Sequence, residues 1–353
     1  MDFLAGNRIR GTTAEKATLV PAITGTGGWK EVARTTLGTA TTEIDVSSIP
    51  DKRYYMTLLS SVGLSQAATS RFRYNGDTGN TKAYRQSSDG TTDALDDTIN
   101  GINIKSGGNT ELPWFNVGYH ANLSAKEKLM ISHTVAQTAA GAGNAPSRDE
   151  IVGKQVLTSS INQITSFLAS SGSYSSGAEM VVLGWDEDDT HGSNFWEELA
   201  STTLTSAGDN LSSGTISAKK YLWFQAYIIP TGGSANCNLT FNNDTSSNYS
   251  LRYTEGTNEQ TLTGESLISM DVAKKSTPFF INGFVINNSA NEKLSIIHQM
   301  NQDSTGAGNA PTRNEIVGKW ANTSAQITEI DIDNPQVGVD YNTGSMLKVW
   351  GSN

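Results

Sequence analysis

The chain has 353 residues, among them 35 acidic and 25 basic side chains, and a net charge of −10. Because Lys and Arg do not cluster, the chain lacks the basic surface that binds phosphates, and we expect no nucleic-acid partner. The single cysteine, Cys237, excludes an intrachain disulfide framework and a multi-cysteine metal site, and no run reaches the roughly 18 apolar residues of a membrane span.

Residues 1–27 open the chain and have no counterpart later in it. They are too short for a domain, so we expect an N-terminal arm that orders against a neighbouring molecule, with disorder as the alternative. The candidate docking residues of this arm are Phe3, Leu4, Arg8, Ile9 and Arg10. The arm has no basic region followed by an apolar segment, and the sequence predicts no secretory signal.

A long stretch of the chain occurs twice. The loop 141–154 returns as residues 306–319, with changes only at Ser147 and Asp149, which become Thr312 and Asn314. Further matches pair Trp29 with Trp196, Tyr54 with Tyr221, and His133 with His298. A match of this length in a polar, Gly-rich stretch indicates a duplicated domain rather than a short solenoid repeat.

The matches place the first domain at 28–185 and the second at 195–353, each a normal size for one β-sandwich. Residues 186–194 between them are acidic and polar without apolar periodicity. We expect a solvated, exposed linker here rather than a cation site.

Short segments rich in β-branched and aromatic residues recur in both copies, and they predict β-strands. They include residues 53–59 and 128–133 in the first copy and 220–229 and 294–298 in the second. Gly and Asn turns such as 74–77 suit antiparallel hairpins, and long helical periodicity is absent. We therefore expect an all-β chain of two tandem antiparallel β-sandwiches of jelly-roll type, related by internal duplication.

The repeated loop is the strongest candidate for an interaction site, because long surface loops often carry function. Its candidate residues are Asn144, Arg148 and Glu150 in the first copy and Asn309, Arg313 and Glu315 in the second. The arginines would bind a carboxylate or a sugar hydroxyl through charge-assisted hydrogen bonds. The favoured alternative is a capping box, in which Ser147 or Thr312 begins a short helix and the glutamate follows three residues later.

Other residues give little sign of chemistry. His133 and His298 each lie near the end of an apolar strand, which predicts satisfied, half-buried histidines. Nucleophile elbow, His-Glu-x-x-His and phosphate-loop motifs are absent, so we expect no enzyme, no cofactor and no metal. The aromatic residues at 114, 115 and 119 match aromatics at 279, 280 and 284, and alternation along a strand makes them core residues rather than a platform for sugar rings.

Each copy opens near a Trp, continues through a Phe/Tyr-Asn-x-Asp turn and a Lys-Leu strand, and closes on a strand that ends near Gly184 or Gly351. In this the chain resembles structural proteins of tailed and environmental bacteriophages and of archaeal viruses. Residues 3–12 are also similar to the start of many such proteins. The resemblance implies a virion protein assembled in the host cytoplasm, and it transfers no catalytic residues.

Two functions are therefore expected. The first is a non-enzymatic virion structural protein, a capsid, capsid-decoration or appendage subunit, that associates with copies of itself and with other virion proteins. The alternative is a tail or fibre protein that binds a receptor or a glycan of the host surface.

Overall fold

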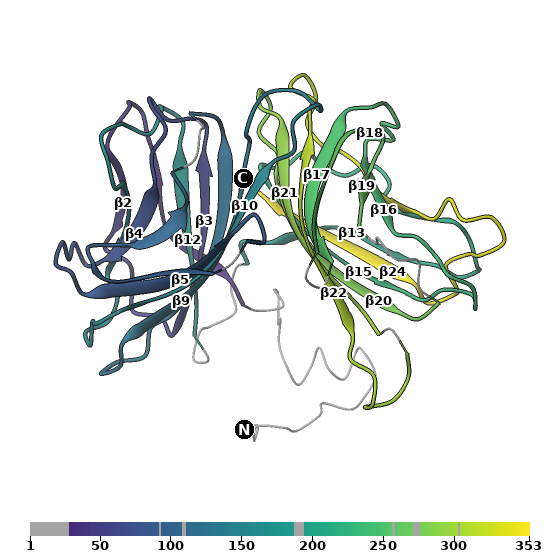
Figure 1. Cartoon of the computed structure of the whole chain (residues 1–353), viewed down its shortest axis with the longest axis horizontal. Coiled ribbons are helices and arrows are strands. Elements are labelled where there is room, and N and C mark those ends of the chain that lie inside the picture. Colours follow the sequence, from purple (N-terminus) through teal and green to yellow (C-terminus); the bar gives the residue numbers. More distant parts are fainter. Residues whose placement is uncertain are drawn as a thin grey trace, which may run out of the picture.

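The computed structural model describes residues 28–91, 93–107, 111–186, 194–255, 258–270, 276–302 and 304–353. In these ranges every element of regular secondary structure is a β-strand. Strands β1–β12 form domain 1, and strands β13–β24 form domain 2 (Figure 1). The predicted all-β, tandem β-sandwich fold is confirmed. The described part of the chain therefore has no helix that would be long and apolar enough to cross a membrane. The candidate arm residues Phe3, Leu4, Arg8, Ile9 and Arg10, and linker residues 187–193, lie outside these ranges.

Domain 1 contains the first twelve strands. They are β1 Lys30–Thr36, β2 Glu43–Ser47, β3 Tyr54–Ser61, β4 Ser70–Tyr74, β5 Lys82–Ser88, β6 Ala94–Ile99, β7 Ile102–Lys105, β8 Trp114–Ala121, β9 Lys128–Ala136, β10 Ser147–Gln155, β11 Gln163–Leu168 and β12 Glu179–Trp185.

Domain 2 repeats this series. Its strands are β13 Glu197–Thr203, β14 Asn210–Ser212, β15 Tyr221–Ile228, β16 Asn238–Phe241, β17 Tyr249–Glu255, β18 Asn258–Glu265, β19 Ile268–Ser269, β20 Phe279–Ile286, β21 Lys293–Asn301, β22 Thr312–Trp320, β23 Ile330–Asp333 and β24 Met346–Ser352.

The two domains share one topology. In domain 1 an eight-stranded sheet of order β1-β12-β3-β8-β9-β10-β5-β6 faces a four-stranded sheet of order β2-β11-β4-β7. Domain 2 has the same orders in its own strands, β13-β24-β15-β20-β21-β22-β17-β18 and β14-β23-β16-β19. Neighbouring strands pair antiparallel, as in β9–β10 and β21–β22. The duplication seen in the sequence is therefore a duplication of the whole sandwich.

Each sandwich has its own core, and a third core joins the two domains. Alternation along β9 shows why: Met130 points into domain 1, whereas Val135 points out of the eight-stranded sheet toward domain 2. The joining core contains outward side chains of both large sheets, including Phe115 from β8 and Phe284 from β20. In Figure 1 the eight-stranded sheets accordingly lie toward the middle, and the four-stranded sheets lie on the outer sides.

The capping-box interpretation of Ser147 and Thr312 is wrong. Ser147 begins strand β10, which is hydrogen-bonded to β9 on one side and to β5 on the other, and Thr312 begins the equivalent strand β22. Ladders on both sides of Asp149–Gln155 bond most backbone groups of the segment, which one capping hydrogen bond cannot match. The carboxylate of Asp149 is buried and accepts hydrogen bonds from Ser88 and from the backbone N–H of Ser106.

The turn at 74–77 is present, but it does not form a hairpin. Asn75 and Gly76 both have positive φ angles, of 54° and 65°, and the turn carries the chain from β4 in the small sheet to β5 in the large one. Asp77 then forms an ion pair with the buried Lys82, with a distance of 2.9 Å between the ammonium nitrogen and the carboxylate oxygen. The turn therefore ties the two sheets of domain 1 together.

Candidate functional site

The junction between the two domains gathers the charged residues that the sequence marks as candidates. They are Arg148 and Glu150 on β10 and Arg313 and Glu315 on β22. The two candidate asparagines, Asn144 and Asn309, lie in the loops that precede these strands. The junction therefore brings the charged candidates near one another, whereas the asparagine side chains bond within their own loops.

The loop before β10 docks on domain 2 through its backbone. Three side chains of domain 2 donate hydrogen bonds to its carbonyl oxygens. Ser250 donates to Asn144 (2.8 Å), Arg252 to Pro146 (2.9 Å) and Lys319 to Gly141 (2.7 Å). Glu292 in turn accepts the N–H of Gly141 at 2.6 Å. This loop is thus held by the second domain of its own chain. The side chain of Asn309, by contrast, bonds within its own loop, to the carbonyl of Thr305 at 3.0 Å.

Arg148 and its twin Arg313 have opposite environments. The side chain of Arg148 is 4% exposed, and its guanidinium donates to the carbonyl of Glu315 at 2.6 Å and to the hydroxyl of Thr254. It also forms an ion pair with Glu259 at 3.2 Å. The side chain of Arg313 is 68% exposed and pairs with Glu315 of its own strand at 3.3 Å. Arg148 therefore fastens the two domains, whereas Arg313 projects from the surface.

Two histidines and a glutamate meet beside these arginines. The rings of His133 on β9 and His298 on β21 lie 4.6 Å apart, nearly at right angles. One ligand atom from each histidine and one carboxylate oxygen of Glu150 all lie within 4.8 Å of one another. Sequence reasoning missed this cluster, although the matching positions of the two histidines in the duplicated domains were a usable signal.

Burial sets the protonation of this cluster. It lowers the pKa of His133 to about 3, with the neighbouring His298 and Arg148 adding to the effect. Burial also lowers the pKa of His298. For Glu150, burial raises the pKa to about 7, Arg148 opposes the rise, and the nearby Glu315 adds to it. Both imidazoles are therefore neutral near pH 7.

The aromatic candidates are mostly buried. Trp114 lies in the core of domain 1, and Phe115 lies in the core that joins the domains. Tyr119 is partly buried against the same joining core. The prediction that the aromatic residues are core residues is confirmed for Trp114, Phe115, Phe279 and Phe284, and it is wrong for Phe280, which is 41% exposed.

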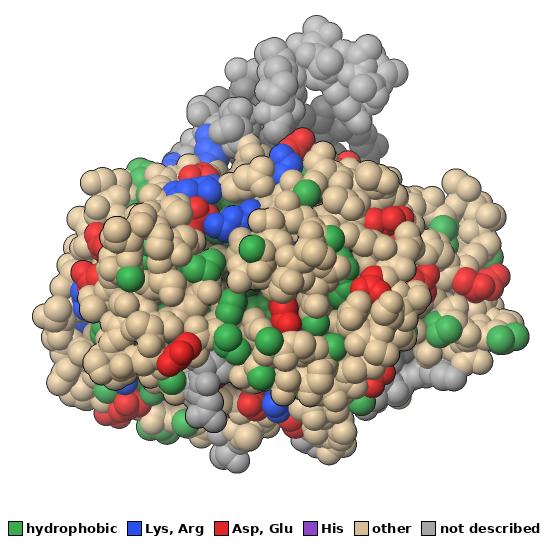
Figure 2. All heavy atoms as spheres, turned by 90° about the horizontal axis from the view of Figure 1, so that it is seen from above, with side chains coloured by type: hydrophobic (Ala, Val, Ile, Leu, Met, Phe, Trp, Pro, Cys, Tyr) green, Lys and Arg blue, Asp and Glu red, His purple; other side chains and the backbone are tan. Residues whose placement is uncertain are grey.

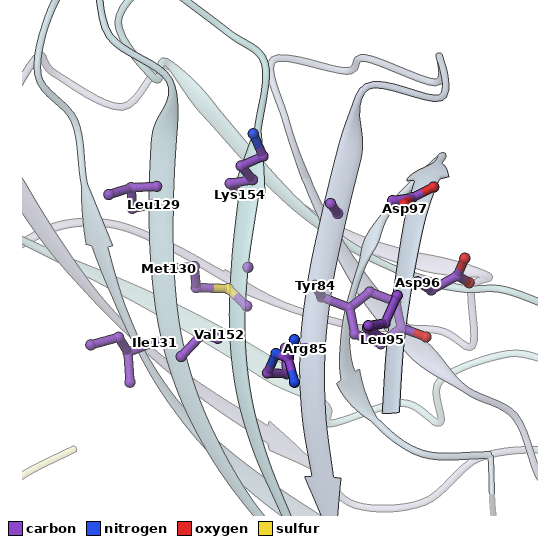
Figure 3. Close-up of a pocket in the computed structure, with 12 residues that line it drawn as sticks. Tyr84, Arg85, Leu95, Asp96, Asp97, Leu129, Met130, Ile131, Val152 and Lys154 are labelled. Carbon is purple, nitrogen blue, oxygen red and sulfur yellow. The ribbon is translucent and has the colours of Figure 1, made fainter. Parts of the chain in front are cut away.

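Each domain exposes one row of apolar side chains on its large sheet. In domain 1, Ile131, Val152 and Leu95 lie on this row, and Leu129 lies beside Ile131. We call these four residues the open face of domain 1. Figure 3 shows the pocket of about 540 Å³ that they border, together with Tyr84 and Arg85 from β5.

In domain 2 the exposed row is formed by Met346, Tyr227, Phe280 and Met300, which are cross-strand neighbours on β24, β15, β20 and β21. We call these four residues the open face of domain 2.

Most twins of the open-face residues are buried at the domain junction. Ile131 is 52% exposed, but its twin Ile296 is 4% exposed. Phe280 is 41% exposed, but its twin Phe115 is 1% exposed. The two domains thus use opposite halves of the same sheet surface to hold each other, and each leaves the remaining half uncovered.

No family model and no curated protein matches this chain. Among solved structures, domains LG4-5 of the mouse laminin alpha1 chain are similar at 8% identity and a TM-score of 0.20, over 93% of this chain and 92% of that one. Ail, the attachment invasion locus protein of Yersinia pestis, is similar at 6% identity and a TM-score of 0.14, over 77% of this chain and 98% of that one. At these scores the likenesses carry no inference about this chain.

Proposed function

We propose that the chain is a non-enzymatic structural protein that acts by self-assembly, and that it is a capsid, capsid-decoration or appendage subunit of a virion. The virion setting is supported by the resemblance of the sequence, and the self-assembly by the two open faces. The observation that carries the proposal is that each open face has a twin buried against another domain of this protein.

The twins supply evidence that these surfaces bind protein. Ile131, Val152 and Arg85 lie side by side on β9, β10 and β5, and their twins Ile296, Val317 and Arg252 lie side by side on the equivalent strands. The second set packs against domain 1. A surface of nearly the same composition is therefore already part of a protein interface, and exposed apolar patches with polar rims mark such interfaces.

The occupant that this argument favours is a second copy. The open face of domain 2 in one molecule would pack on the open face of domain 1 in the next, with contacts of the kind that already join the domains. Such a contact uses two different surfaces, so it is heterologous and produces rings or filaments. Figure 2 shows scattered charges on the face of the molecule that is seen from above. The net charge of −10 opposes contact between copies, so the apolar contact has to outweigh this repulsion.

The contact is expected to be weak when made once. Complete burial of a large apolar side chain contributes about 1.5–3 kcal/mol, so a half-exposed one contributes about 1 kcal/mol. The eight side chains of the two open faces then supply about 8 kcal/mol, which is comparable to the cost of immobilising one molecule on another. Assembly therefore requires high concentration, or contacts repeated in a closed or extended array.

The test is the mass of the full chain over a wide concentration range, by light scattering and sedimentation, with electron microscopy of any assemblies. We expect rings, filaments or lattices for the wild type and monomers for Ile131→Glu or Met300→Glu. The control is Val337→Glu, which places the same charge at a 92% exposed apolar residue outside both faces and should leave assembly intact. A monomeric wild type at every concentration, or assembly by both glutamate variants, would contradict the proposal.

Glycan binding is the second candidate, and one observation favours it. The pocket of domain 1 is bordered by the charged side chains of Arg85, Asp97 and Lys154 beside apolar Leu95 and Val152, a combination that can bind sugar hydroxyls. A glycan array probed with the wild type and with Arg85→Ala tests it. Retention of a glycan by the wild type and its loss in the variant would support this function, whereas no retention would remove it.

A further inference from the structure

The histidine and glutamate cluster joins the two domains with side chains that bind metals. His133 and Glu150 come from adjacent strands of domain 1, and His298 comes from domain 2. Two imidazoles and one carboxylate are a common ligand set for Zn²⁺ and for related divalent transition metals. Both domains must be present for this set to be complete.

One nitrogen of the cluster lacks a partner. Nδ1 of His133 is buried, and among the described residues it has no hydrogen bond. Buried polar atoms are nearly always bonded, so an orphan of this kind points to an unrecorded water or ion. A neutral imidazole nitrogen has a lone pair, which is the form that coordinates metals.

We propose that His133, His298 and Glu150 bind one divalent transition-metal ion with the ligand preferences of Zn²⁺, and that this ion ties domain 1 to domain 2. Ligand atoms of a tetrahedral zinc site lie about 3.3 Å apart, as follows from bonds of about 2.0–2.1 Å. The three ligand atoms lie within 4.8 Å of one another, so the side chains must approach by up to about 1.5 Å. Rotation of these half-buried side chains provides that movement.

The charges around the cluster set the strength of the site. Nε of Arg148 lies 3.5 Å from the Glu150 carboxylate, and the ion pair between Arg313 and Glu315 lies close by. The two guanidinium groups oppose a cation, and the two carboxylates favour it. Glu315 interacts with Glu150 and adds negative charge beside the three ligands. We therefore expect a site that is weaker than a four-ligand structural zinc site.

The probe is Co²⁺, whose visible absorption reports the ligands and geometry of zinc-type sites. The full chain is first treated with a chelator and then titrated, and we expect an absorption band that saturates at one Co²⁺ per chain and disappears when Zn²⁺ is added. His133→Gln and His298→Gln should each weaken binding by about 100-fold or more, because losing a ligand exceeds the effect of losing an outer-shell partner. Glu127→Gln is the matched control, since Glu127 is an exposed carboxylate paired with Lys154, and it should bind as the wild type does.

Two results would overturn the proposal. One is the absence of saturable Co²⁺ binding by the wild type. The other is equal binding by the wild type and both glutamine variants. Where a variant fails to fold, as judged by circular dichroism, the wild type still decides the question by NMR. Zn²⁺ must shift the ring proton signals of two histidines out of the four in the chain, and unchanged signals refute the site.

Discussion

The opposite environments of Arg148 and Arg313 allow a matched test of the domain junction. Replacing each arginine by alanine removes the same atoms from twin positions on β10 and β22. Arg148→Ala removes hydrogen bonds to the carbonyl of Glu315 and the hydroxyl of Thr254, and an ion pair with Glu259, all of which cross the junction. Arg313→Ala removes one exposed ion pair within its own strand.

The structure sets the size of the two effects. A hydrogen bond to a charged group contributes about 1.5–3 kcal/mol, and breaking a buried ion pair costs about 3–5 kcal/mol. Glu259 keeps a second cation, because Arg252 lies 3.5 Å from it, so we take the lower end and expect Arg148→Ala to cost about 3 kcal/mol. The exposed pair of Arg313 is worth about 0–1 kcal/mol.

Urea unfolding followed by tryptophan fluorescence measures both losses, and tryptophans lie in domain 1, at the junction and in domain 2. Arg148→Ala should also broaden the transition, because the two sandwiches then unfold less cooperatively. Equal losses for the two variants would refute the assignment of Arg148 to the junction.

Two further predictions concern packing and protonation. Phe115→Ala should cost about 3–5 kcal/mol because it empties part of the joining core, whereas its twin Phe280→Ala, at an exposed position, should cost less than about 1 kcal/mol in the same urea assay. His120 is buried, bonded to Tyr74 and Thr57, and has its pKa lowered to about 3. Because its folded pKa lies below its unfolded value of about 6.5, the unfolded chain takes up the proton first. The stability of the wild type relative to His120→Gln should therefore fall by about 1.4 kcal/mol per pH unit as the pH drops from 6.5 toward 4.5, and parallel pH profiles would contradict this.

The sequence predicts the fold well because the fold is recorded in local patterns. Alternating residues such as those of β9 specify a strand with two distinct faces, and the duplicated matches assign the same strand to domain 2. The capping box fails for the opposite reason. Ser147 and Glu150 have the spacing of a helix start, but the flanking strands β9 and β5 decide the conformation, and they come from distant parts of the chain.

The candidate site could be predicted only in part, because it depends on how the two domains meet. Arg148 and Arg313 lie in nearly identical local sequences, so no local pattern separates the buried one from the exposed one. Nor does a local pattern show that His133 and His298 meet, because they approach each other only when the large sheets pack face to face. A duplicated sequence shows which residues correspond, but it does not show which of them are in contact at the domain junction.

Where the two copies differ in sequence, the differences follow their environments. Glu179 of domain 1 is buried at the junction. There it accepts a hydrogen bond from Tyr221 at 2.7 Å and forms an ion pair with Lys220 at 2.8 Å. Its twin on β24 is Met346, a half-exposed residue of the open face. A carboxylate at that uncovered position would favour solvent, whereas a methionine favours a partner surface. The substitution therefore makes the open face of domain 2 more apolar than its buried twin, which is the change expected of a surface that binds another protein molecule.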